Sequence, residues 1–550
     1  MNIAETWQVA RHYSARRIAR RVQLRLLRGG LIRASRLLPS LDRRYAPRGS
    51  VILAADLLAS CDKPACFDID PAGQQVTLLG QTVELASPVD WTGQGDALSS
   101  SHLRRYHLHY MEYLCGVDDA AFERIVRDWI AHNRPFAGAR SDAYASYCIS
   151  IRVMVWLDEL KRRRQTLPRS LTVDMTASLV EQVNVMAAFV ETDLGGNHLF
   201  RNLRTLLWAS ACLECADASR WRRLALRLLD HELTAQFLPD GFHFERCPAY
   251  HGQVMLDLAD LRRLSLPMPV AERLDGIYNR AAEAFAWVRH PHGQVSRLGD
   301  GLFGQCEAQP PDVDAAEPTA TRHFDDAGLV ILRAPGELAL YDVGAMAPFD
   351  LPGHAHADVF TLEWTVNRCP VLVDPGVYEY EATEHRAYAR STPAHNTVSL
   401  NGDDQANLHG AFRVGRTPEV QVSLCELSDN GFDVTASHDG WQSRYGVTHE
   451  RRVAAQPGTL EITDRTPGAS RVSAHGHFLF HPDCALRAVC ETEVMVEAPG
   501  ATVRVSASVA LKCTTAPYFP QMGERVSAPA LRYALADGDT HVRFDVVKDN

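Results

Sequence analysis

Apolar positions divide the chain into a helical part and a strand-rich part. Between about residues 100 and 290, apolar residues recur at spacings of three and four, which is typical of helices with one buried face. These runs predict helices over Phe122–Ile130, Ile149–Leu160, Leu171–Phe189, Leu199–Leu213, Trp221–Leu229 and Val254–Leu266. Short breaks separate the runs, at Asn133-Arg-Pro, Gln165–Pro168, Gly195-Gly196 and Pro239-Asp-Gly. Helices joined by such short connections are expected to pair, and paired helices over this length indicate an α/α toroid.

Beyond Ala327 the pattern changes to short runs that alternate or are rich in β-branched residues. Such runs, separated by Gly-containing turns, predict an antiparallel β-sandwich. They are Leu329–Leu332, Val371–Val373, Thr397–Leu400, Phe432–Ala436 and Thr502–Val505. A short hairpin is also expected within Phe67–Leu85, around Pro71-Ala-Gly73.

Four segments follow from these patterns. The segment between the two halves, with Gln309-Pro-Pro-Asp and Glu317-Pro-Thr-Ala, is rich in proline, alanine and acidic residues and has little to bury, so it reads as a linker. The predicted organisation is a basic helical segment over residues 1–50, a helical toroid domain over 51–308, a linker over 309–326 and a β-sandwich domain over 327–550.

Composition is that of a soluble globular protein with two large domains: 550 residues, 46% hydrophobic and 23% charged. No apolar run is long enough to span a bilayer, and no export signal is evident at the N-terminus. The 13 cysteines are scattered and odd in number, which favours reduced thiols and a cytoplasmic location. Cys212-Leu-Glu-Cys215 lies in an apolar helical stretch without a second pair, so a metal or redox role there is not favoured.

Charge is unevenly distributed. Residues 1–50 contain twelve arginines against Glu5 and Asp42, a net charge of +10, whereas the whole chain carries −10. Three interpretations stay open: a helix on an anionic membrane surface or acidic partner, a helix packed on the acidic body of its own chain, and an arginine-rich targeting peptide. The first would place the protein peripherally at the inner membrane. Nucleic-acid binding is not expected, because no binding motif accompanies the charge.

The strand-rich half contains a cluster of histidines and carboxylates. In Gly353–Asp358, His354 and His356 are two residues apart and would point to the same side of an extended segment. Neutral imidazoles serve as proton-transfer groups or metal ligands. His356, Asp374 and His395 form a set of ligands for a divalent metal such as zinc, which leaves His354 free for proton transfer. H-x-H by itself is a weak signal, and ordinary buried histidines are the alternative.

A second cluster lies in the helical half. Within Gly195–Asn202, the glycine pair ends one helix, and Asn197 and His198 begin the next. Asp240–His251 starts with a turn signal, Asp-Gly, and leads into another helix that carries Tyr250. Polar groups at helix starts often line a cleft; the alternative is a helix cap and hydrogen-bonded interior groups.

With both clusters in this order, the chain resembles the heparinase II/III-like polysaccharide lyases. The resemblance covers about Trp91 to Pro482, with departures at Phe242, where the family usually has Gly, and Cys247, where it usually has Ser. Its carriers are Leu108–Tyr113, Gly196–Leu199, Asp240–His251, Gly353–Asp358 and Ser391–Val398. It implies an incomplete N-terminal (α/α) toroid followed by a C-terminal antiparallel β-sandwich.

The family chemistry is β-elimination at a uronic acid. The proton on C5 becomes removable when the neighbouring carboxylate is neutralised and the developing enolate is stabilised. In such a reaction Asn197 would donate amide hydrogen bonds to that carboxylate, and His198 would assist. The resemblance gives Tyr250 the role of acid, and of base when proton and leaving group lie on one face, and gives His354 the role of base in the opposite geometry.

Other residues hold the site or the substrate. The metal at His356, Asp374 and His395 would be structural, positioning the strand that presents His354. Arg246 and Arg390 are candidates for binding sugar carboxylates or sulfates, with internal salt bridges as the alternative.

The function expected is therefore a lyase that acts on an acidic, uronate-containing polysaccharide or oligosaccharide. It would degrade imported oligosaccharides or take part in capsule or exopolysaccharide production. Two alternatives stay open: a metal-assisted glycan hydrolase, and a glycan-binding protein without turnover.

Overall fold

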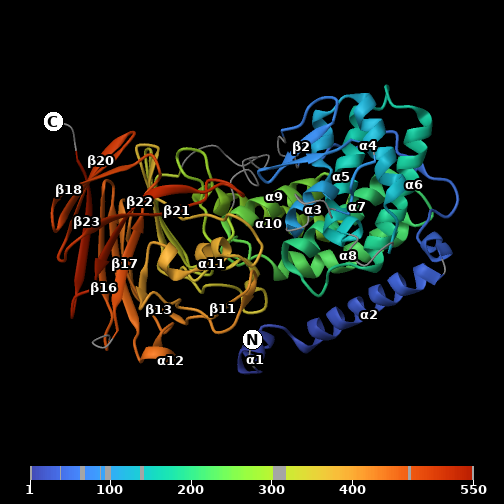
Figure 1. Ribbon diagram of the computed structural model, residues 1–550. Helices are drawn as coiled ribbons and strands as arrows, with labels where there is room; N and C mark the ends of the chain where they lie inside the picture. Colours follow the sequence, from blue (N-terminus) through green and yellow to red (C-terminus); the bar gives the residue numbers. More distant parts are fainter. Residues whose placement is uncertain are drawn as a thin grey trace. The chain divides into compact units, whose positions relative to one another are not determined.

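The structure, a computed structural model, describes residues 3–37, 39–61, 68–86, 88–92, 101–136, 142–301, 318–468 and 472–547. Over these residues the chain divides into two compact units (Figure 1). The helical unit comprises Ser14–Gln236 and Gln253–Tyr278, and the sheet unit comprises Met1–Tyr13, Phe237–Gly252 and Asn279–Asn550. The units interleave along the sequence, because Phe237–Gly252 belongs to the sheet unit although helical-unit residues flank it on both sides.

The helical unit is built from successive helices, joined by short connections from α3 onwards. They are α2 (Ala15–Leu37), α3 (His102–Tyr110), α4 (Asp119–His132), α5 (Ser146–Arg162), α6 (Arg169–Ala188), α7 (Gly196–Cys212) and α8 (Ala218–Ala235). Two further helices, α9 (Pro248–Arg262) and α10 (Met268–Trp287), belong partly to this unit and partly to the sheet unit. Short strand pairs accompany them: β1 (Ile52–Leu53) with β4 (Leu213–Glu214), and β2 (Gln75–Leu78) with β3 (Gln81–Glu84). α1 (Ile3–Ala10) belongs to the sheet unit.

Local sequence explains where these helices begin and which face they bury. The side chain of Asp118 accepts a hydrogen bond from Ala121 N at 2.8 Å and caps α4, satisfying a backbone donor that the first turn leaves unpaired. Along α5, Val153, Trp156 and Leu160 are buried at the predicted spacing. Each run of apolar residues predicted as a helix lies within or overlaps one of α4 to α9, so the helical prediction is confirmed.

The sheet unit consists of antiparallel sheets. The first has the order β5 (Ala320–Phe324), β6 (Leu329–Ala334), β7 (Glu337–Asp342), β8 (Leu362–Val366) and β9 (Cys369–Leu372). The largest has the order β13 (Val420–Ser428), β14 (Gly431–His438), β15 (His449–Gln456), β16 (Thr459–Arg465), β23 (Thr540–Val547), β20 (Ala501–Ala507), β19 (Glu493–Ala498) and β18 (Ala485–Cys490). Another has the order β10 (Val398–Leu400), β17 (Ala474–Leu479), β22 (Val526–Ala534) and β21 (Lys512–Tyr518), and β11 (Leu408–His409) pairs with β12 (Arg413–Val414).

One shared hydrophobic core joins the first sheet to the largest one. Trp364 on β8, Val453 on β15 and Phe544 on β23 belong to the same buried cluster. Burial alternates along β14 and β15, as expected for strands that present one face to a core. The prediction of an antiparallel β-sandwich is therefore confirmed. Short helical turns lie in the connections between its strands: α11 (Glu384–Arg390), α12 (Gln442–Tyr445), and the 3-10 turns η4 (Pro352–His354) and η5 (Thr392–Ala394).

The predicted turn at Pro71-Ala-Gly73 is present: Gly73 N donates to Asp70 O at 2.8 Å, and Ile69 forms an antiparallel bridge with Val76. A second hairpin, which was not predicted, follows it. Its strands are β2 and β3, and the chain reverses at Leu79 and Gly80, whose φ angles are 50° and 74°. A leucine gives no signal for such a left-handed turn, whereas Pro71-Ala-Gly73 does.

Most of the predicted linker, residues 309–317, lies outside the described residues, and β5 occupies residues 320–324. Among the helices the structure describes, none combines the length and apolar character needed to cross a membrane.

Candidate functional site

The loop that carries His354 and His356 connects β7 to β8. It forms the turn η4 and then continues in extended conformation, with Ala355 at ψ 147°. Ala357 N donates to Arg390 O at 2.9 Å, which ties the loop to the end of α11. Both imidazoles reach the same carboxylate, as expected for residues two apart in an extended segment.

That carboxylate belongs to Asp300, which follows α10 in the sequence. Its Oδ2 lies 2.9 Å from Nδ1 of His354, and its Oδ1 lies 2.9 Å from Nε2 of His356. Asp300 N also donates to His354 O at 3.0 Å. Gly299 permits this approach: its φ is +64°, and a Cβ there would lie 2.7 Å from His354 O.

Asp300 is held in its charged form by its neighbours. Burial by itself would raise the pKa of Asp300, but the guanidinium of Arg386 and the two imidazoles outweigh burial and hold that pKa well below its usual range. Arg386 donates to both carboxylate oxygens, through Nη1 to Oδ1 and through Nη2 to Oδ2, the latter at 3.0 Å. A charged carboxylate only accepts hydrogen bonds, so each imidazole places its N–H on the nitrogen that faces Asp300.

The tautomers follow from that assignment. When neutral, His354 donates through Nδ1 and carries its lone pair on Nε2; Nε2 lies 3.5 Å from Oε2 of Glu245, so the ring faces a carboxylate on both sides. The His354 side chain is 15% exposed, so Nε2 is at the border of the buried region rather than sealed within it. A lone pair oriented by a buried carboxylate on the other ring nitrogen is the arrangement of a general base.

Tyr250 packs directly against His354. The ring centroids are 4.0 Å apart, and the Tyr250 hydroxyl lies 2.9 Å from the hydroxyl of Tyr380. Burial, reinforced by the charge of Asp300, raises the pKa of Tyr380 well above its ordinary value, so Tyr380 keeps its proton. Tyr380 can therefore donate to Tyr250, which leaves Tyr250 able to accept or release a proton.

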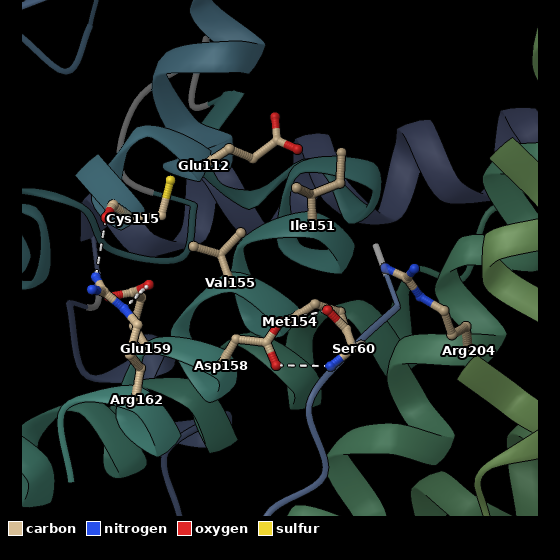
Figure 2. Close-up of a pocket in the computed structure, with 10 residues that line it drawn as sticks. All are labelled: Ser60, Glu112, Cys115, Ile151, Met154, Val155, Asp158, Glu159, Arg162 and Arg204. Atoms are coloured by element: carbon tan, nitrogen blue, oxygen red, sulfur yellow. Dashed lines mark hydrogen bonds and ion pairs between the residues drawn. The ribbon is translucent and has the colours of Figure 1, made fainter. Parts of the chain in front are cut away.

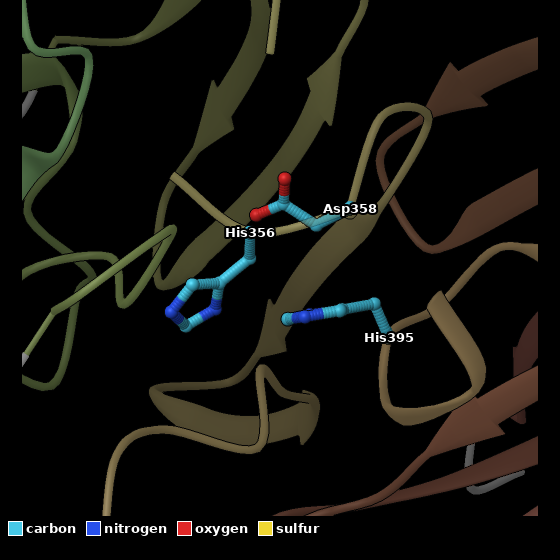
Figure 3. A group of neighbouring side chains, drawn as sticks. All are labelled: His356, Asp358 and His395. Atoms are coloured by element: carbon cyan, nitrogen blue, oxygen red, sulfur yellow. The ribbon is translucent and has the colours of Figure 1, made fainter. Parts of the chain in front are cut away.

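Beside this acid–base cluster lies a group of side chains that fits a metal ion. His356, Asp358 and His395 each offer a ligand atom, and these atoms lie within 4.8 Å of one another. Figure 3 shows the two imidazole rings turned towards each other, with the carboxylate of Asp358 close to His356. Nδ1 of His356 and Nε2 of His395 are buried without a hydrogen-bond partner in the described part of the chain. Buried nitrogens without a partner are costly, and a metal ion would satisfy both.

The structure gives Asp374 a different place from the one predicted. Its Oδ2 lies 2.8 Å from Nδ1 of His395, and its Oδ1 accepts a hydrogen bond from Gly376 N. Asp374 therefore hydrogen-bonds to His395 as Asp300 does to His356, and Asp358, not Asp374, is the carboxylate grouped with the two imidazoles within 4.8 Å. Carboxylates that bind the outer nitrogen of ligand histidines are a common feature of zinc sites.

The electrostatics of the cluster differ between its two histidines. Burial would lower the pKa of His395, but the charge of Asp374 outweighs burial and raises that pKa, which favours the protonated ring in the absence of a metal. Burial lowers the pKa of His356 to about 4, so its imidazole is neutral and can act as a ligand. Burial raises the pKa of Asp358 to about 7, because nothing near this carboxylate compensates fully for the loss of water. A divalent cation would supply the missing compensation.

The arginines predicted to bind substrate contact backbone carbonyls instead. Arg390 is 1% exposed, and it donates to Ala355 O at 3.3 Å and to Gly410 O at 3.0 Å. It therefore braces the loop of His354 and does not face solvent, which corrects its predicted role. Arg246 is half-buried and donates to Ala345 O at 2.7 Å and to Asp326 O at 2.8 Å, so two of its nitrogens are engaged within the sheet unit.

The helical unit carries Asn197 and His198 at the start of α7, as predicted. Gly195 precedes the helix with φ 74°, and no side chain caps the helix there. Asn197 Nδ2 donates to Oε1 of Gln253 at 3.2 Å, and the ring of His198 packs on Tyr147 with centroids 4.2 Å apart. The uncapped first turn of a helix attracts anions through its free N–H groups and dipole.

The helical unit also contains a cavity of about 240 Å³ (Figure 2). Ile151, Met154 and Val155 of α5 form its apolar side, and Asp158 accepts hydrogen bonds from Ser60 beside them. The residues predicted from sequence to act in catalysis are not among those that line it. This cavity is therefore separate from the predicted catalytic residues.

Sequence reasoning missed several members of the site. Asp300 and Tyr380 come from segments without a recognised motif. The one local signal is the pair of glycines on either side of Asp300, which indicates a turn that carries a carboxylate. Asp358 could have been found, since the alternation that joins His354 to His356 continues to it.

The fold combines a helical toroid with a β-sandwich. Its sheet unit holds a cluster of Tyr250 and His354, suited to proton transfer, next to a cluster of His356, Asp358 and His395, suited to a metal ion. Residues 98–289 match the model of the heparinase II/III N-terminus, and residues 316–541 match that of the heparinase II/III-like C-terminal domain. The chain belongs to the heparinase II/III-like family.

Individual relatives are distant. The chain is 23% identical over 308 residues to a heparin-sulfate lyase of Bacteroides stercoris, covering 50% of this chain and 46% of that protein. A heparin-sulfate lyase of Bacteroides thetaiotaomicron is 20% identical over 234 residues, which is 39% of this chain and 33% of the relative. The chain thus spans less than half the length of these relatives.

Solved structures share the fold. Heparinase III superposes with a TM-score of 0.67 at 16% identity, covering 84% of this chain and 79% of that one. A heparan sulfate lyase from Pedobacter heparinus superposes with a TM-score of 0.55 at 14% identity, covering 85% and 80%. These likenesses confirm the predicted fold class.

Proposed function

We propose that the protein is a polysaccharide lyase that cleaves a uronate-containing acidic glycan, of the glycosaminoglycan class, by β-elimination. The observation that carries the proposal is the contact between Tyr250 and His354, with Asp300 behind the histidine and Tyr380 behind the tyrosine. Two proton-transfer groups in contact, each oriented by a second residue, fit a reaction that removes a proton and protonates a leaving oxygen. The names of the distant relatives support the substrate class.

The proposed reaction starts at the uronate carboxylate. Asn197 and His198 neutralise it, the role that their motif suggests, and the uncapped start of α7 supports an anion-binding role there. His354 removes the C5 proton through Nε2, or Tyr250 does so when the proton and leaving group lie on one face. Tyr250 then donates a proton to the glycosidic oxygen, and Tyr380 donates to Tyr250 while the phenolate persists.

We also propose that the cluster of His356, Asp358 and His395 holds a zinc ion with a structural role. Two imidazole lone pairs and a carboxylate would supply three of the four positions of tetrahedral zinc. The ligand residues are almost fully buried, with exposures of 0% for the histidines and 5% for Asp358. When bound, the ion would fix the loop that presents His354. Three ligands leave a fourth position, but the burial of all three residues keeps a glycan away from it, so the arrangement favours a lyase over a metal-assisted hydrolase.

The test is ultraviolet absorbance of the C4–C5 double bond that elimination leaves on the new non-reducing end. The purified chain is incubated with a panel of uronate polysaccharides, beside Tyr250→Phe and His354→Ala. Matched controls are Tyr445→Phe and His231→Ala, which change residues outside the cluster. The proposal expects a rise in absorbance with the parent chain and both controls, and a loss of at least about a hundredfold in both site variants.

Other outcomes separate the alternatives. New reducing ends without absorbance would show hydrolysis and overturn the lyase proposal. Glycan binding that survives Tyr250→Phe, with no turnover by the parent chain on any member of the panel, would favour a binding protein.

A further inference from the structure

The long N-terminal helix α2, the blue helix in Figure 1, has two unlike faces. One face packs on the helical unit. Arg21 Nε lies 3.2 Å from Oδ2 of Asp193, and Arg20 Nε donates to Oγ1 of Thr192 at 3.3 Å. A side chain at Gly195 would meet Nη2 of Arg17 at 2.7 Å, so this arginine also lies on the loop before α7. The interpretation that the basic segment packs on the acidic body of its own chain thus accounts for this face only.

The opposite face of α2 is apolar and exposed. Ile18, Val22 and Leu26 follow one another at a spacing of four and are 44%, 50% and 71% exposed, and Leu37 on the same side is 83% exposed. Leu24 and Leu31, on the packed face, are half-buried. An ordinary surface helix buries its apolar stripe and exposes its charges. In α2, by contrast, Arg20 and Arg21 contact the helical unit while Ile18, Val22 and Leu26 are exposed, and Leu27 is also 47% exposed.

Arginines also surround this exposed stripe. Arg16, Arg25 and Arg33 are exposed, and no ion pair or side-chain hydrogen bond of theirs is found in the described part of the chain. Gly30, exposed on the same side, would have open space around a Cβ, so the helix backbone is accessible there. The stripe and its flanking arginines extend along a 23-residue helix, about 34 Å long.

We propose that this outward face of α2 binds the surface of a membrane that contains anionic phospholipids. Ile18, Val22 and Leu26 enter the boundary between headgroups and acyl chains, and Arg16, Arg25 and Arg33 bind the lipid phosphates. Charge complementarity selects anionic over zwitterionic lipid. The apolar stripe selects lipid over an acidic polysaccharide, which offers phosphate-like charge but no apolar layer. The helix lies in the plane of the interface and does not cross it.

The experiment is co-sedimentation of the full chain with vesicles, either of phosphatidylcholine or of equal parts phosphatidylcholine and phosphatidylglycerol. The test variants are I18S/V22S/L26S and R16S/R25S/R33S. The matched controls are V173S/M268S, which removes exposed apolar side chains of α6 and α10, and R169S/R223S/R227S, which removes the same charge from α6 and α8. All substituted residues are exposed, so each variant is expected to fold, and circular dichroism checks this.

The proposal expects binding to the anionic vesicles only, weakened by salt. Both test variants should bind at least about tenfold more weakly, and both controls within about twofold of the parent chain. Equal binding by the apolar test variant, or no binding to anionic vesicles, would overturn the proposal. Two other results would also overturn it. One is binding to dextran sulfate beads without binding to vesicles, which would indicate an acidic polysaccharide as the partner. The other is a dimer of the parent chain that becomes monomeric in I18S/V22S/L26S, which would indicate a second copy of the chain. Lyase activity on a soluble glycan should be unchanged in these variants, which separates this test from that of the proposed function.

Discussion

Oδ2 of Asp300 lies 2.9 Å from Nδ1 of His354, and this contact makes a distant carboxylate the residue that sets the tautomer of the histidine. The second oxygen of Asp300 binds His356 at the same distance. One buried carboxylate therefore orients both the proposed base and a proposed metal ligand, which couples the two clusters.

Asp300→Asn should disable both roles at once. An asparagine side chain can present its amide N–H to only one imidazole and its oxygen to the other, so at least one histidine takes the wrong tautomer. We expect kcat to fall by about a thousandfold or more, as loss of an orienting carboxylate behind a histidine base does elsewhere. Absorbance assays measure the loss, and metal analysis of the same preparation measures metal content.

The matched control is Asp439→Asn, which removes a half-exposed carboxylate that pairs with Arg416. Because Asp300 also compensates the charge of Arg386, circular dichroism must show that the variant is folded. Unchanged activity in a folded Asp300→Asn variant would remove Asp300 from the proposed mechanism.

Tyr380→Phe should weaken catalysis without abolishing it. The Tyr380 hydroxyl lies 2.9 Å from that of Tyr250, and burial raises the pKa of Tyr380 well above its ordinary value, so it stays a donor. Removing this donor should lower kcat by about tenfold and move the alkaline side of the pH–rate profile to higher pH, because the Tyr250 phenolate loses a hydrogen bond. Tyr250→Phe should abolish activity instead. Equal loss in both variants would argue against this division of roles.

The sequence predicted the members of the site that obey local spacing rules. His354 and His356 meet one carboxylate because alternate residues of an extended segment share a side, and the glycine pair marked the start of α7. Asp300 is 54 residues from His354, and its approach depends on the left-handed conformation of Gly299. No periodicity in a single sequence encodes such a long-range contact.

The same limit explains why the second hairpin and the position of Asp358 were not predicted. Leu79 adopts φ 50°, although leucine has no preference for that conformation, so the sequence gives no signal for this turn. Asp374 and Asp358 are both carboxylates near histidines in the sequence, and only the folded geometry shows that Asp374 lies behind His395. Periodicity was sufficient for the helices and strands, because their buried faces repeat within a few residues.

Removal of the proposed metal should lower the stability of the sheet unit. We expect the purified protein to contain about one zinc per chain, and His395→Ala to lose it, since Nε2 of His395 points into the cluster. Thermal unfolding of the parent chain should move to lower temperature after dialysis against a chelator, with an effect of about 3 kcal/mol if the ion is present at a hundred times its Kd. Elemental analysis and calorimetry check both results.

His475→Ala is the matched control, because this histidine lies on β17 and bonds Ser473 outside the cluster. A parent protein free of metal, with unfolding unaffected by chelator, would contradict the structural metal. Asp374→Asn should still bind the metal, with reduced affinity, whereas Asp358→Asn should lose it.

Acid should destabilise the helical unit through His109. This side chain is buried on α3, and its Nδ1 accepts a hydrogen bond from Trp129 Nε1 at 3.3 Å, which requires a neutral ring nitrogen there. Burial, with the charge of Arg152 adding to it, lowers the pKa of His109 from 6.5 to about 3. The unfolded chain therefore binds a proton that the folded chain does not, and stability present above pH 6.5 is lost as the pH falls towards 3, at roughly 1 kcal/mol per pH unit. Urea unfolding at pH 7.5, 5.5 and 4.5 measures how the free energy of unfolding changes with pH.

His109→Gln keeps an acceptor for Trp129 but cannot titrate, so the change of its unfolding free energy with pH should be smaller by that amount. His231→Gln, at a position whose side chain is 77% exposed, should leave the slope unchanged. Equal slopes in the parent chain and His109→Gln would show that other groups carry the acid sensitivity.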